Sequence, residues 1–245
     1  MKKTGEETTT KINDLIITQR NDFQNFTLDS VLLADFITIN RTIKNSLDIG
    51  AGTGIISLLL ARRSKTNITA VELYETMSNI TRINVENNLL SNRIRVINSD
   101  IRDYKKYFHK DEFDLIFSNP PYFEYDGNVE QINQLEQLAK ARHEVDITLE
   151  EIIQIVSYLL RNKGYFSLVV RSDRVLEITK ILEKYNLIPK RIKYCFTKKD
   201  KNSKLCLIES IKDASKGVQI EYPIFIYEYN GEKSDYVKKL YETYE

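Results

Sequence analysis

Short apolar runs alternate with amphipathic segments from Ser46 onward. The apolar runs have the length and β-branched composition of buried strands, and the segments between them repeat apolar residues at helical spacing. These patterns predict strands that end at Asp48, at Glu72, just before Asp100 and at Asn119, with helices over residues 55–61 and 75–90 between the first three. Strands that alternate with helices form parallel sheets with helices on both faces. We therefore predict an α/β fold.

The second half of the chain continues this pattern and adds a hairpin. Thr148 and Glu151 form a capping-box sequence ahead of an apolar stripe, which predicts a helix that stops at Lys163-Gly164. A strand over residues 165–170 and a helix ended by Pro189 follow. Beyond them the sequence predicts antiparallel strands over 191–197 and 205–210, a final strand over 224–229 and a short helix from Ser234.

The first 45 residues do not share this pattern, and we expect them to form an extension to a main domain of residues 46–245. Residues 1 to about 12 are polar and rich in threonine, so we expect a mobile tail. A short extended segment follows, and residues 28–39 have the apolar spacing of a helix that would cover the binding pocket. Asp29 and Ser30 at its start either cap free N–H groups or help to close that pocket, and capping is the role we favour.

Composition places the chain among globular proteins with a sizeable core. It has 245 residues, 42% of them hydrophobic, and a formal net charge of +1. No apolar stretch is long enough to cross a membrane, and polar residues follow Lys2-Lys3, so we expect a cytoplasmic protein. Two histidines and two cysteines argue against a multi-ligand zinc centre, and Cys195 and Cys206 are expected to be buried free thiols.

Basic residues concentrate in the second half of the chain. Between Arg161 and Lys216 there are 15 Lys and Arg against 6 Asp and Glu, and the densest stretch is 198–204. Such a run is either a solvated loop or a set of phosphate contacts. The candidates for phosphate contact are Arg142, Lys198, Lys199 and Lys201.

A glycine-rich stretch links the strand that ends at Asp48 to the helix after it. Gly50, Gly52 and Gly54 permit positive φ angles and a close backbone approach to a ligand at a helix N-terminus. Their spacing differs from the dinucleotide fingerprint Gly-x-Gly-x-x-Gly. The carboxylate of Asp48 would repel a phosphate but suit a cationic amino group. This combination favours a nucleoside that carries an amino acid over NAD.

The sequence Asn119-Pro120-Pro121-Tyr122 ends the fourth predicted strand. Prolines cannot donate backbone hydrogen bonds, so the strand stops there and leaves an amide, prolyl carbonyls and an aromatic ring at its carboxyl end. Ligands of open parallel sheets bind at that end. Neutral acceptors beneath a ring suit a planar amino or amide group. The alternative is a proline-rich turn that only ends the strand.

Two further acids follow strands at the same predicted edge. Glu72 ends the second strand, where a buried charge needs a partner, and a ribose diol would supply two hydroxyl donors. A helix cap or a surface acid is the alternative for Glu72. Asp100 follows the third strand. We predict that Asp48, Glu72 and Asp100 bind an amino group, a ribose and an adenine amine, respectively.

This order of elements resembles the class I S-adenosylmethionine-dependent methyltransferases, and Asn-Pro-Pro-Tyr narrows the resemblance to enzymes that methylate amino groups of adenine, guanine or glutamine. Three further stretches are similar to signatures of the bacterial tRNA1(Val) adenine-N6-methyltransferase family, so that the resemblance covers almost the whole chain. They are Phe-Gln-Asn-Phe-Thr-Leu-Asp-Ser-Val-Leu-Leu-Ala at 23–34, Ala-Arg-His-Glu at 141–144 ahead of Leu149-Glu150-Glu151, and Leu-Leu-Arg-Asn-Lys-Gly-Tyr-Phe at 159–166.

The resemblance implies a Rossmann-like class I fold, with a mostly parallel seven-stranded sheet and an antiparallel C-terminal strand pair. The implied cofactor is S-adenosylmethionine, bound by the loop from Asp48 to Gly54, by Glu72 and by Asp100 with the adjoining Ile101. The implied catalytic residues are Asn119, Pro120, Pro121 and Tyr122, with Tyr122 also stacking on the target base. The implied substrate is the adenine 3′ of the anticodon of a valine tRNA, with no metal, membrane or obligate protein partner.

Three other functions stay open. A protein glutamine-N5 methyltransferase uses the same tetrapeptide but normally has an N-terminal helical domain, and only about 45 residues precede the glycine loop here. A guanine-N2 enzyme acting on rRNA often has a duplicated domain, of which the sequence gives no sign. A non-catalytic RNA-binding subunit is disfavoured because both motifs are complete. Residues 123–142 are either a mobile flap over the substrate or a variable loop.

Overall fold

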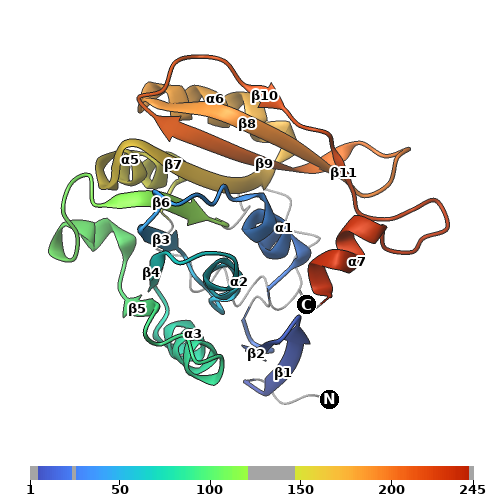
Figure 1. Ribbon diagram of the computed structural model, residues 1–245, viewed down its shortest axis with the longest axis horizontal. Helices are drawn as coiled ribbons and strands as arrows, with labels where there is room; N and C mark the ends of the chain where they lie inside the picture. The colour runs from blue at the N-terminus through green and yellow to red at the C-terminus, as the bar shows by residue number, and fades with distance from the viewer. Residues whose placement is uncertain (1–4, 24–25, 121–146, 243–245) are drawn as a thin grey trace, which may run out of the picture.

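The computed structural model describes residues 5–23, 26–120 and 147–242, which are organised around one large sheet (Figure 1). The strands of this sheet, in the order in which they lie side by side, are β10 (Gln219–Ile220), β8 (Leu187–Phe196), β9 (Ser203–Lys212), β7 (Leu160–Arg171), β6 (Phe113–Ser118), β3 (Asn45–Ile49), β4 (Asn67–Glu72) and β5 (Ile94–Asn98), with β11 (Ile224–Phe225) also paired to β8. Only β9 runs antiparallel to its neighbours β7 and β8. Apart from the two-residue strands β10 and β11, this is the predicted mostly parallel α/β sheet.

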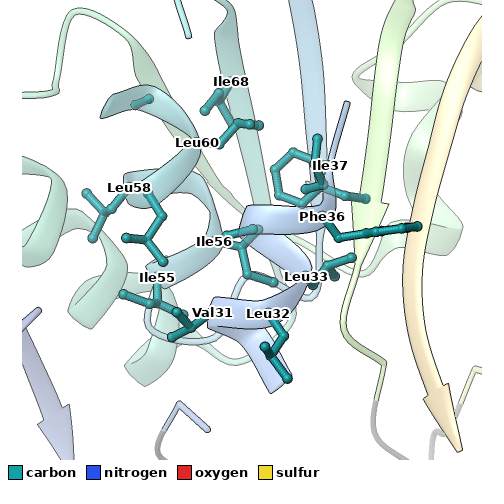
Figure 2. Close-up of a cluster of buried hydrophobic side chains, with 14 of the residues drawn as sticks. Val31, Leu32, Leu33, Phe36, Ile37, Ile55, Ile56, Leu58, Leu60 and Ile68 are labelled. Carbon is teal, nitrogen blue, oxygen red and sulfur yellow. The ribbon is translucent and has the colours of Figure 1, made fainter. Parts of the chain in front are cut away.

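Helices cover both faces of the sheet, as the alternation of elements predicts. One buried cluster includes side chains of α1 (Leu28–Phe36), α2 (Ile55–Arg63) and the end of α3 (Glu75–Asn87). The other includes side chains of α5 (Leu149–Leu159), α6 (Val175–Lys184) and the 3-10 helix η1 (Ile101–Lys106). Along β6, Leu115 and Phe117 belong to the first cluster and Ile116 to the second, because successive strand residues face opposite sides. Figure 2 shows how closely the apolar side chains of α1 and α2 pack.

Residues 7–12 form strand β1 (Glu7–Ile12), so the expectation of a mobile tail is wrong for this segment. β1 pairs antiparallel with β2 (Leu15–Arg20), from Glu7↔Arg20 to Ile12↔Leu15. The turn between them holds Asn13 at φ 53°, in the left-handed region that asparagine tolerates. The β-branched threonines and the Asn13-Asp14 pair are hairpin signals that the polar composition of the segment obscured.

Asn84 of α3 and Asn88, the C-cap residue of this helix, bind the free edge of the hairpin as a further strand would. The Asn84 amide accepts from Thr18 N at 2.7 Å and donates to Thr18 O at 3.0 Å. Asn88 pairs in the same way with Ile16, accepting from its N at 2.9 Å and donating to its O at 2.7 Å. Backbone groups along the open edge of β2 are thereby satisfied, which they must be once they are buried.

Several predicted features of the second half are confirmed. Thr148 and Glu151 form the capping box, in which Glu151 Oε2 accepts from Thr148 N at 2.8 Å. The predicted hairpin is the pair β8 and β9, and Ser234 caps α7 (Asp235–Tyr241). Cys195 and Cys206 are buried and free. Burial raises the pKa of each thiol to about 12, so both are inert at neutral pH.

Some boundaries of helices and strands differ from the predicted ones. α5 ends at Leu159 and β7 begins at the next residue, so Lys163 at φ 61° lies inside a strand, where the pairing with β6 shifts register between Phe113 and Leu115. α6 ends at Lys184, before Asn186 at φ 59°, so Pro189 does not end this helix but lies within β8. The final predicted strand shrinks to the two residues of β11. The helix predicted over 28–39 ends at Phe36, because Ile37 is already extended at φ −53° and ψ 126°.

A buried carboxylate joins the segment after α1 to the far half of the sheet. Glu209 on β9 is 1% exposed. Its Oε1 accepts from Thr38 Oγ1 at 2.6 Å and Arg191 Nη1 at 2.8 Å, and its Oε2 accepts from Thr38 N and Ser167 Oγ, both at 2.9 Å. Arg191 also pairs with Glu221 and lies over the ring of Phe36, with 4.3 Å to its centroid. Two of these four hydrogen bonds come from Thr38 and tie the segment after α1 to β9, and the other two come from Ser167 on β7 and Arg191 on β8.

Candidate functional site

The glycine-rich stretch and the Asn-Pro sequence lie at the carboxyl ends of adjacent strands. β3 pairs in parallel with β6 up to Ile49↔Ser118, so the residues that follow leave the sheet at the same edge. Ser118 Oγ donates to Ile49 O at 2.8 Å and links the two strand ends. The fold therefore brings two stretches together that are about 70 residues apart in the chain.

All three glycines of the loop have positive φ angles, 73° at Gly50, 58° at Gly52 and 79° at Gly54. A Cβ built on Gly50 or Gly52 would meet nothing within 4 Å, whereas a Cβ on Gly54 would lie 2.8 Å from Thr81 Cγ2. The first two glycines thus border open space, and the third is needed for packing against α3. Open space beside bare backbone at the start of α2 is what a ligand at this loop requires.

Two polar side chains of α3 hold the loop in this shape. Thr81 Oγ1 donates to Gly52 O at 2.6 Å, and Asn84 Nδ2 donates to Thr53 O at 2.9 Å. Neither residue was predicted from the sequence. Their signal is that Thr81, Asn84 and Asn88 recur at helical spacing on a face that is otherwise apolar, so buried hydrogen bonds are expected there.

Asp48 lies under the loop with one oxygen unpaired. It is 1% exposed, and its Oδ2 accepts from Ser57 Oγ at 2.7 Å. Its Oδ1 has no hydrogen-bond partner among the described residues. Burial raises the pKa of Asp48 to about 7, with Ser57 opposing and the nearby Glu72 adding to the rise. An unpaired buried carboxylate oxygen fits a cationic amino group, which would supply the missing donor and lower the pKa again.

Glu72 is aligned by two backbone N–H groups. Its Oε2 accepts from Gly52 N at 2.8 Å and its Oε1 from Tyr74 N at 3.0 Å. The side chain is buried, and burial raises its pKa despite these bonds. Each carboxylate oxygen has a second lone pair, so the group can still accept hydroxyl donors. Its bond to Gly52 places it against the same loop as Asp48.

Asp100 has a local partner that the sequence analysis did not consider. Its carboxylate accepts from Arg102 N at 2.8 Å and from Arg102 Nε at 3.0 and 2.9 Å, and it caps η1. Arg102 holds the pKa of Asp100 below its usual range. Ile101, the first residue of η1, is 7% exposed and belongs to the core cluster that η1 shares with α5. The adenine contact of Asp100 and Ile101 stays a prediction.

Asn119 leaves β6 beside the first turn of α1. Its Nδ2 donates to the Oγ of Ser30, which is 6% exposed, at 3.0 Å. The preferred capping role is therefore wrong for Ser30: Thr27 is the N-cap of α1, and it makes no side-chain capping bond. Pro120 is half-buried. Pro121, Tyr122 and Arg142, and the expected flap at 123–142, lie outside the described residues.

The lysine-rich loop follows β8 at this same edge. β8 is antiparallel to β9, which is antiparallel to β7, so β8 runs in the direction of β6 and the two strands end at one side of the sheet. Lys199 and Lys201 are exposed and Lys198 is half-buried. Three steps between strands separate β6 from β8, about 14 Å at 4.8 Å per step. Along the strands, the pairs Ser118↔Leu168, Leu168↔Ile208 and Ile208↔Ile192 place the end of β6 level with Ile192, and β8 continues from there to Phe196, so the loop lies beyond the level of Asn119.

Two further findings concern only the part of the chain that is described. There, no group of three His, Cys, Asp or Glu side chains is placed to hold a metal ion. No helix among residues 5–23, 26–120 and 147–242 is long and apolar enough to span a membrane.

The sequence matches that of known proteins over most of its length. Residues 16–198 match the family described as methyltransferase small domain. The chain is 33% identical over 183 residues to the tRNA1(Val) (adenine(37)-N6)-methyltransferase of Bacteroides thetaiotaomicron, an alignment that covers 74% of this chain and 73% of the relative. It is 35% identical over 159 residues to the protein of the same name from Shewanella halifaxensis, covering 65% of this chain and 63% of that relative.

The fold agrees with this relationship. The crystal structure of a predicted O-methyltransferase from Agrobacterium tumefaciens superposes with a TM-score of 0.69 at 20% identity, covering 88% of this chain and 98% of that one. At this identity the likeness concerns the fold alone, and it is the class I methyltransferase fold that the sequence predicts. Proteins of this kind take their methyl group from S-adenosylmethionine. On the match over residues 16–198, the chain belongs to the methyltransferase small domain family.

Proposed function

We propose that this protein transfers a methyl group from S-adenosylmethionine to N6 of the adenine that its relatives' names specify, adenine 37 of tRNA1(Val). The observation that carries the proposal is the placement of Asn119-Pro120 next to the glycine-rich loop, at the ends of the paired strands β6 and β3. Acceptors for a planar amino group thereby lie beside the proposed cofactor site, as direct transfer between the two requires.

The residues around the loop fit the cofactor. Asp48 offers its unpaired Oδ1 to the amino group, and Glu72 offers its remaining lone pairs to ribose hydroxyls. Gly50 and Gly52 leave room for a ligand against the backbone. S-adenosylmethionine, when bound, supplies a methyl group on a sulfonium that is already a strong donor. The protein therefore needs to position the acceptor rather than to generate a powerful nucleophile.

Asn119 and Pro120 position that acceptor. In the proposal the Asn119 Oδ1 and the Pro120 carbonyl accept the two hydrogens of the adenine amine, which draws its lone pair out of conjugation with the ring and directs it toward the methyl group. The amine loses its proton after transfer, so no histidine base is required. The Ser30 hydroxyl accepts from Asn119 Nδ2 and so fixes which side of the amide presents the oxygen. Ser30 is thus a positioning residue.

Removal of the Ser30 hydroxyl should lower kcat without changing cofactor binding. A hydrogen bond of this kind is worth about 1 kcal/mol, so Ser30→Ala is expected to reduce kcat roughly 5- to 10-fold. Ser30→Thr keeps the acceptor oxygen and should recover most of the rate. Steady-state kinetics together with calorimetric titration of S-adenosylmethionine separate the two effects. A Ser30→Ala enzyme with unchanged kcat would show that Asn119 is oriented by other contacts.

Gly52→Ala should lower the affinity for S-adenosylmethionine in addition to lowering the stability of the fold. Gly52 and Gly231 both have positive φ, 58° and 88°, and an added Cβ meets nothing within 4 Å at either position. Gly52→Ala and Gly231→Ala should each lower the free energy of unfolding by about 1–2 kcal/mol because the backbone is left-handed. Only Gly52→Ala should also weaken S-adenosylmethionine binding, roughly tenfold or more, since its Cβ enters the ligand space. Equal affinity of both variants in calorimetry would place the cofactor elsewhere.

Cofactor affinity should rise with pH up to the pKa of Asp48, which burial raises to about 7. A cationic amino group binds the ionised carboxylate and stabilises it, so binding below pH 7 releases a proton. We expect the affinity to rise by up to about tenfold per unit between about pH 5.5 and 7 and then to level off. Asp48→Asn should bind weakly, with a flat profile over this range. A flat profile for the unsubstituted protein would contradict the role of Asp48.

The raised pKa of Asp48 makes the stability of the unliganded protein fall as the pH rises, whereas the affinity for the cofactor increases. The unfolded carboxyl ionises at its ordinary, lower pKa, so the contribution of Asp48 to stability is complete below that value and is lost as the pH rises through 7. Thermal unfolding of Asp48→Asn without ligand should therefore show a gain in Tm at pH 8 that disappears at pH 4. The two opposite pH trends distinguish a carboxylate kept for binding from one kept for the fold.

A panel of acceptors tests the proposed substrate. Unmodified valine tRNA transcript, rRNA fragments and a release factor would be incubated with the purified protein and labelled S-adenosylmethionine. The proposal predicts incorporation into tRNA that exceeds the other two by at least tenfold. Labelling of rRNA guanine or of release-factor glutamine would keep the chemistry of Asn119-Pro120 and change the substrate. Cofactor binding without transfer to any acceptor would favour a non-catalytic subunit.

A further inference from the structure

An exposed tyrosine lies beside the lysine-rich loop. Tyr229 is 71% exposed, and Lys199 Nζ lies 5.7 Å from its ring centroid and 5.8 Å from that of Phe225. Lys199 Nζ also lies 3.9 Å from Oε2 of Glu228, with which it forms an ion pair. An aromatic ring that is mostly open to solvent, with an ammonium at its face, is the combination that single-stranded nucleic acids bind, a base on the ring and a phosphate on the charge.

The ring is carried by a short turn that is anchored to the end of β8. Ile226 N donates to Phe196 O at 2.9 Å and Tyr227 N donates to Thr197 O at 3.0 Å. Tyr227 also forms an antiparallel bridge with Lys233, which closes the turn that carries Tyr229. The turn therefore has a fixed place next to the loop, so the ring does not need to be ordered when a ligand binds.

Charge and position favour RNA as the occupant. The loop at 198–204 has four lysines against one aspartate. It follows β8 on the side of the sheet where β6 ends. The three steps from β6 to β8 span about 14 Å across the strands, and β8 continues from Ile192, which is level with Ser118, to Phe196, about 13 Å farther along. Several nucleotides of single strand can span this separation. A protein substrate would gain little from a row of lysines unless it were acidic, whereas every nucleotide supplies both a base and a phosphate.

We propose that Tyr229 and Lys199 form a second contact site for the RNA substrate, at which an unpaired nucleotide several positions from the target stacks on Tyr229 while its phosphate pairs with Lys199. This inference rests on the proposed function and assigns to the C-terminal segment a role in substrate binding. The site lies outside the methyl-transfer pocket and acts on the binding of RNA, not on the chemical step.

The test uses the full-length protein and unmodified valine tRNA transcript. Tyr229→Ala should raise the KM for tRNA roughly 5- to 150-fold, the range for loss of one base stack, with little change in kcat or in S-adenosylmethionine affinity. Tyr229→Phe keeps the ring face and should behave like the unsubstituted protein. Tyr222→Ala is the matched control, since Tyr222 is 82% exposed but follows β10, whose partners on β8 lie before the end of that strand. Lys199→Ala should lower the slope of log Kd against log salt concentration by about one.

The outcomes separate this inference from the proposed function. If the unsubstituted protein methylates tRNA and Tyr229→Ala has the same KM, the contact site is wrong and the proposed function stands. If Tyr222→Ala raises the KM as much as Tyr229→Ala, the effect is not specific to the ring beside Lys199, and the inference also fails. If the unsubstituted protein methylates a protein glutamine and no RNA, both proposals fail together.

Discussion

Replacing Asn119 with alanine is expected to lower kcat by about 100- to 1,000-fold while S-adenosylmethionine still binds with its normal affinity. The magnitude is that for loss of one positioned hydrogen-bonding group at a reacting centre. The variant removes the oxygen proposed to accept from the adenine amine but leaves the glycine loop, Asp48 and Glu72 untouched. Single-turnover methylation of tRNA gives the rate of the chemical step, and calorimetry gives the cofactor affinity.

Asn119→Asp is the companion variant. It keeps the shape and the acceptor oxygens, and Ser30 can donate to it in place of accepting. We expect it to retain more activity than Asn119→Ala. If Asn119→Ala transferred methyl groups at a rate near that of the unsubstituted protein, with normal cofactor binding, the mechanism would be wrong.

Glu209→Ala is expected to produce a large loss of stability, about 3 kcal/mol in the free energy of unfolding. The substitution removes four hydrogen bonds and leaves Arg191, Thr38 and Ser167 without their buried acceptor, although Arg191 keeps Glu221. For a chain of this size the loss corresponds to a fall in Tm of roughly 6–12 °C. Thermal or urea unfolding followed by circular dichroism measures it.

The matched control for Glu209 is an exposed ion pair. The side chain of Glu177 is 47% exposed and pairs with Arg174 at 2.6 Å, and such pairs contribute at most about 1 kcal/mol. Glu177→Ala should therefore leave the Tm almost unchanged. Equal effects of Glu209→Ala and Glu177→Ala would mean that the buried network does not hold the N-terminal segment to the sheet.

The strands of the sheet were predictable because each of them is a short run of mostly apolar residues that can be recognised in the local sequence. The run Phe113–Ser118 is apolar at every position except Asp114 and Ser118, a pattern typical of a strand covered on both faces. All four strand ends up to Asn119 were placed within one residue of the structure, and the third strand, predicted to end just before Asp100, ends at Asn98. The start of α5 was also predictable, because its capping box involves only Thr148 and Glu151, which are three residues apart.

The partners of the site residues were not predictable, because they come from distant parts of the chain. Asn119 meets Ser30 across 89 residues, and Asn84 meets Thr18 across 66. Nothing in a local pattern specifies such pairs. Asp100 is the opposite case. Arg102 lies only two residues away, and a basic residue so close to an acid at the start of a helix could have been recognised as its partner.

The N-terminal hairpin shows how composition can mislead. Its polar threonines suggested a mobile tail, but β-branched residues favour strands, and Asn84 and Asn88 supply the hydrogen bonds that make the strand pair stable against α3. The helix after it was predicted from its apolar face, and the polar Ser30 at its start contacts Asn119. Of the two roles considered for Ser30, capping was preferred, but the structure places its hydroxyl against Asn119 instead.

Mass spectrometry of nucleosides from methylated tRNA tests the central claim most directly. Unmodified valine tRNA would be treated with the protein and S-adenosylmethionine, digested to nucleosides and, in parallel, to oligonucleotides that locate the modified base. We expect N6-methyladenosine at the adenine 3′ of the anticodon, and we expect this product to be lost when Asn119→Ala replaces the unsubstituted protein. N2-methylguanosine, N6-methyladenosine at another position, or methylation of protein glutamine with no change in the tRNA would contradict it.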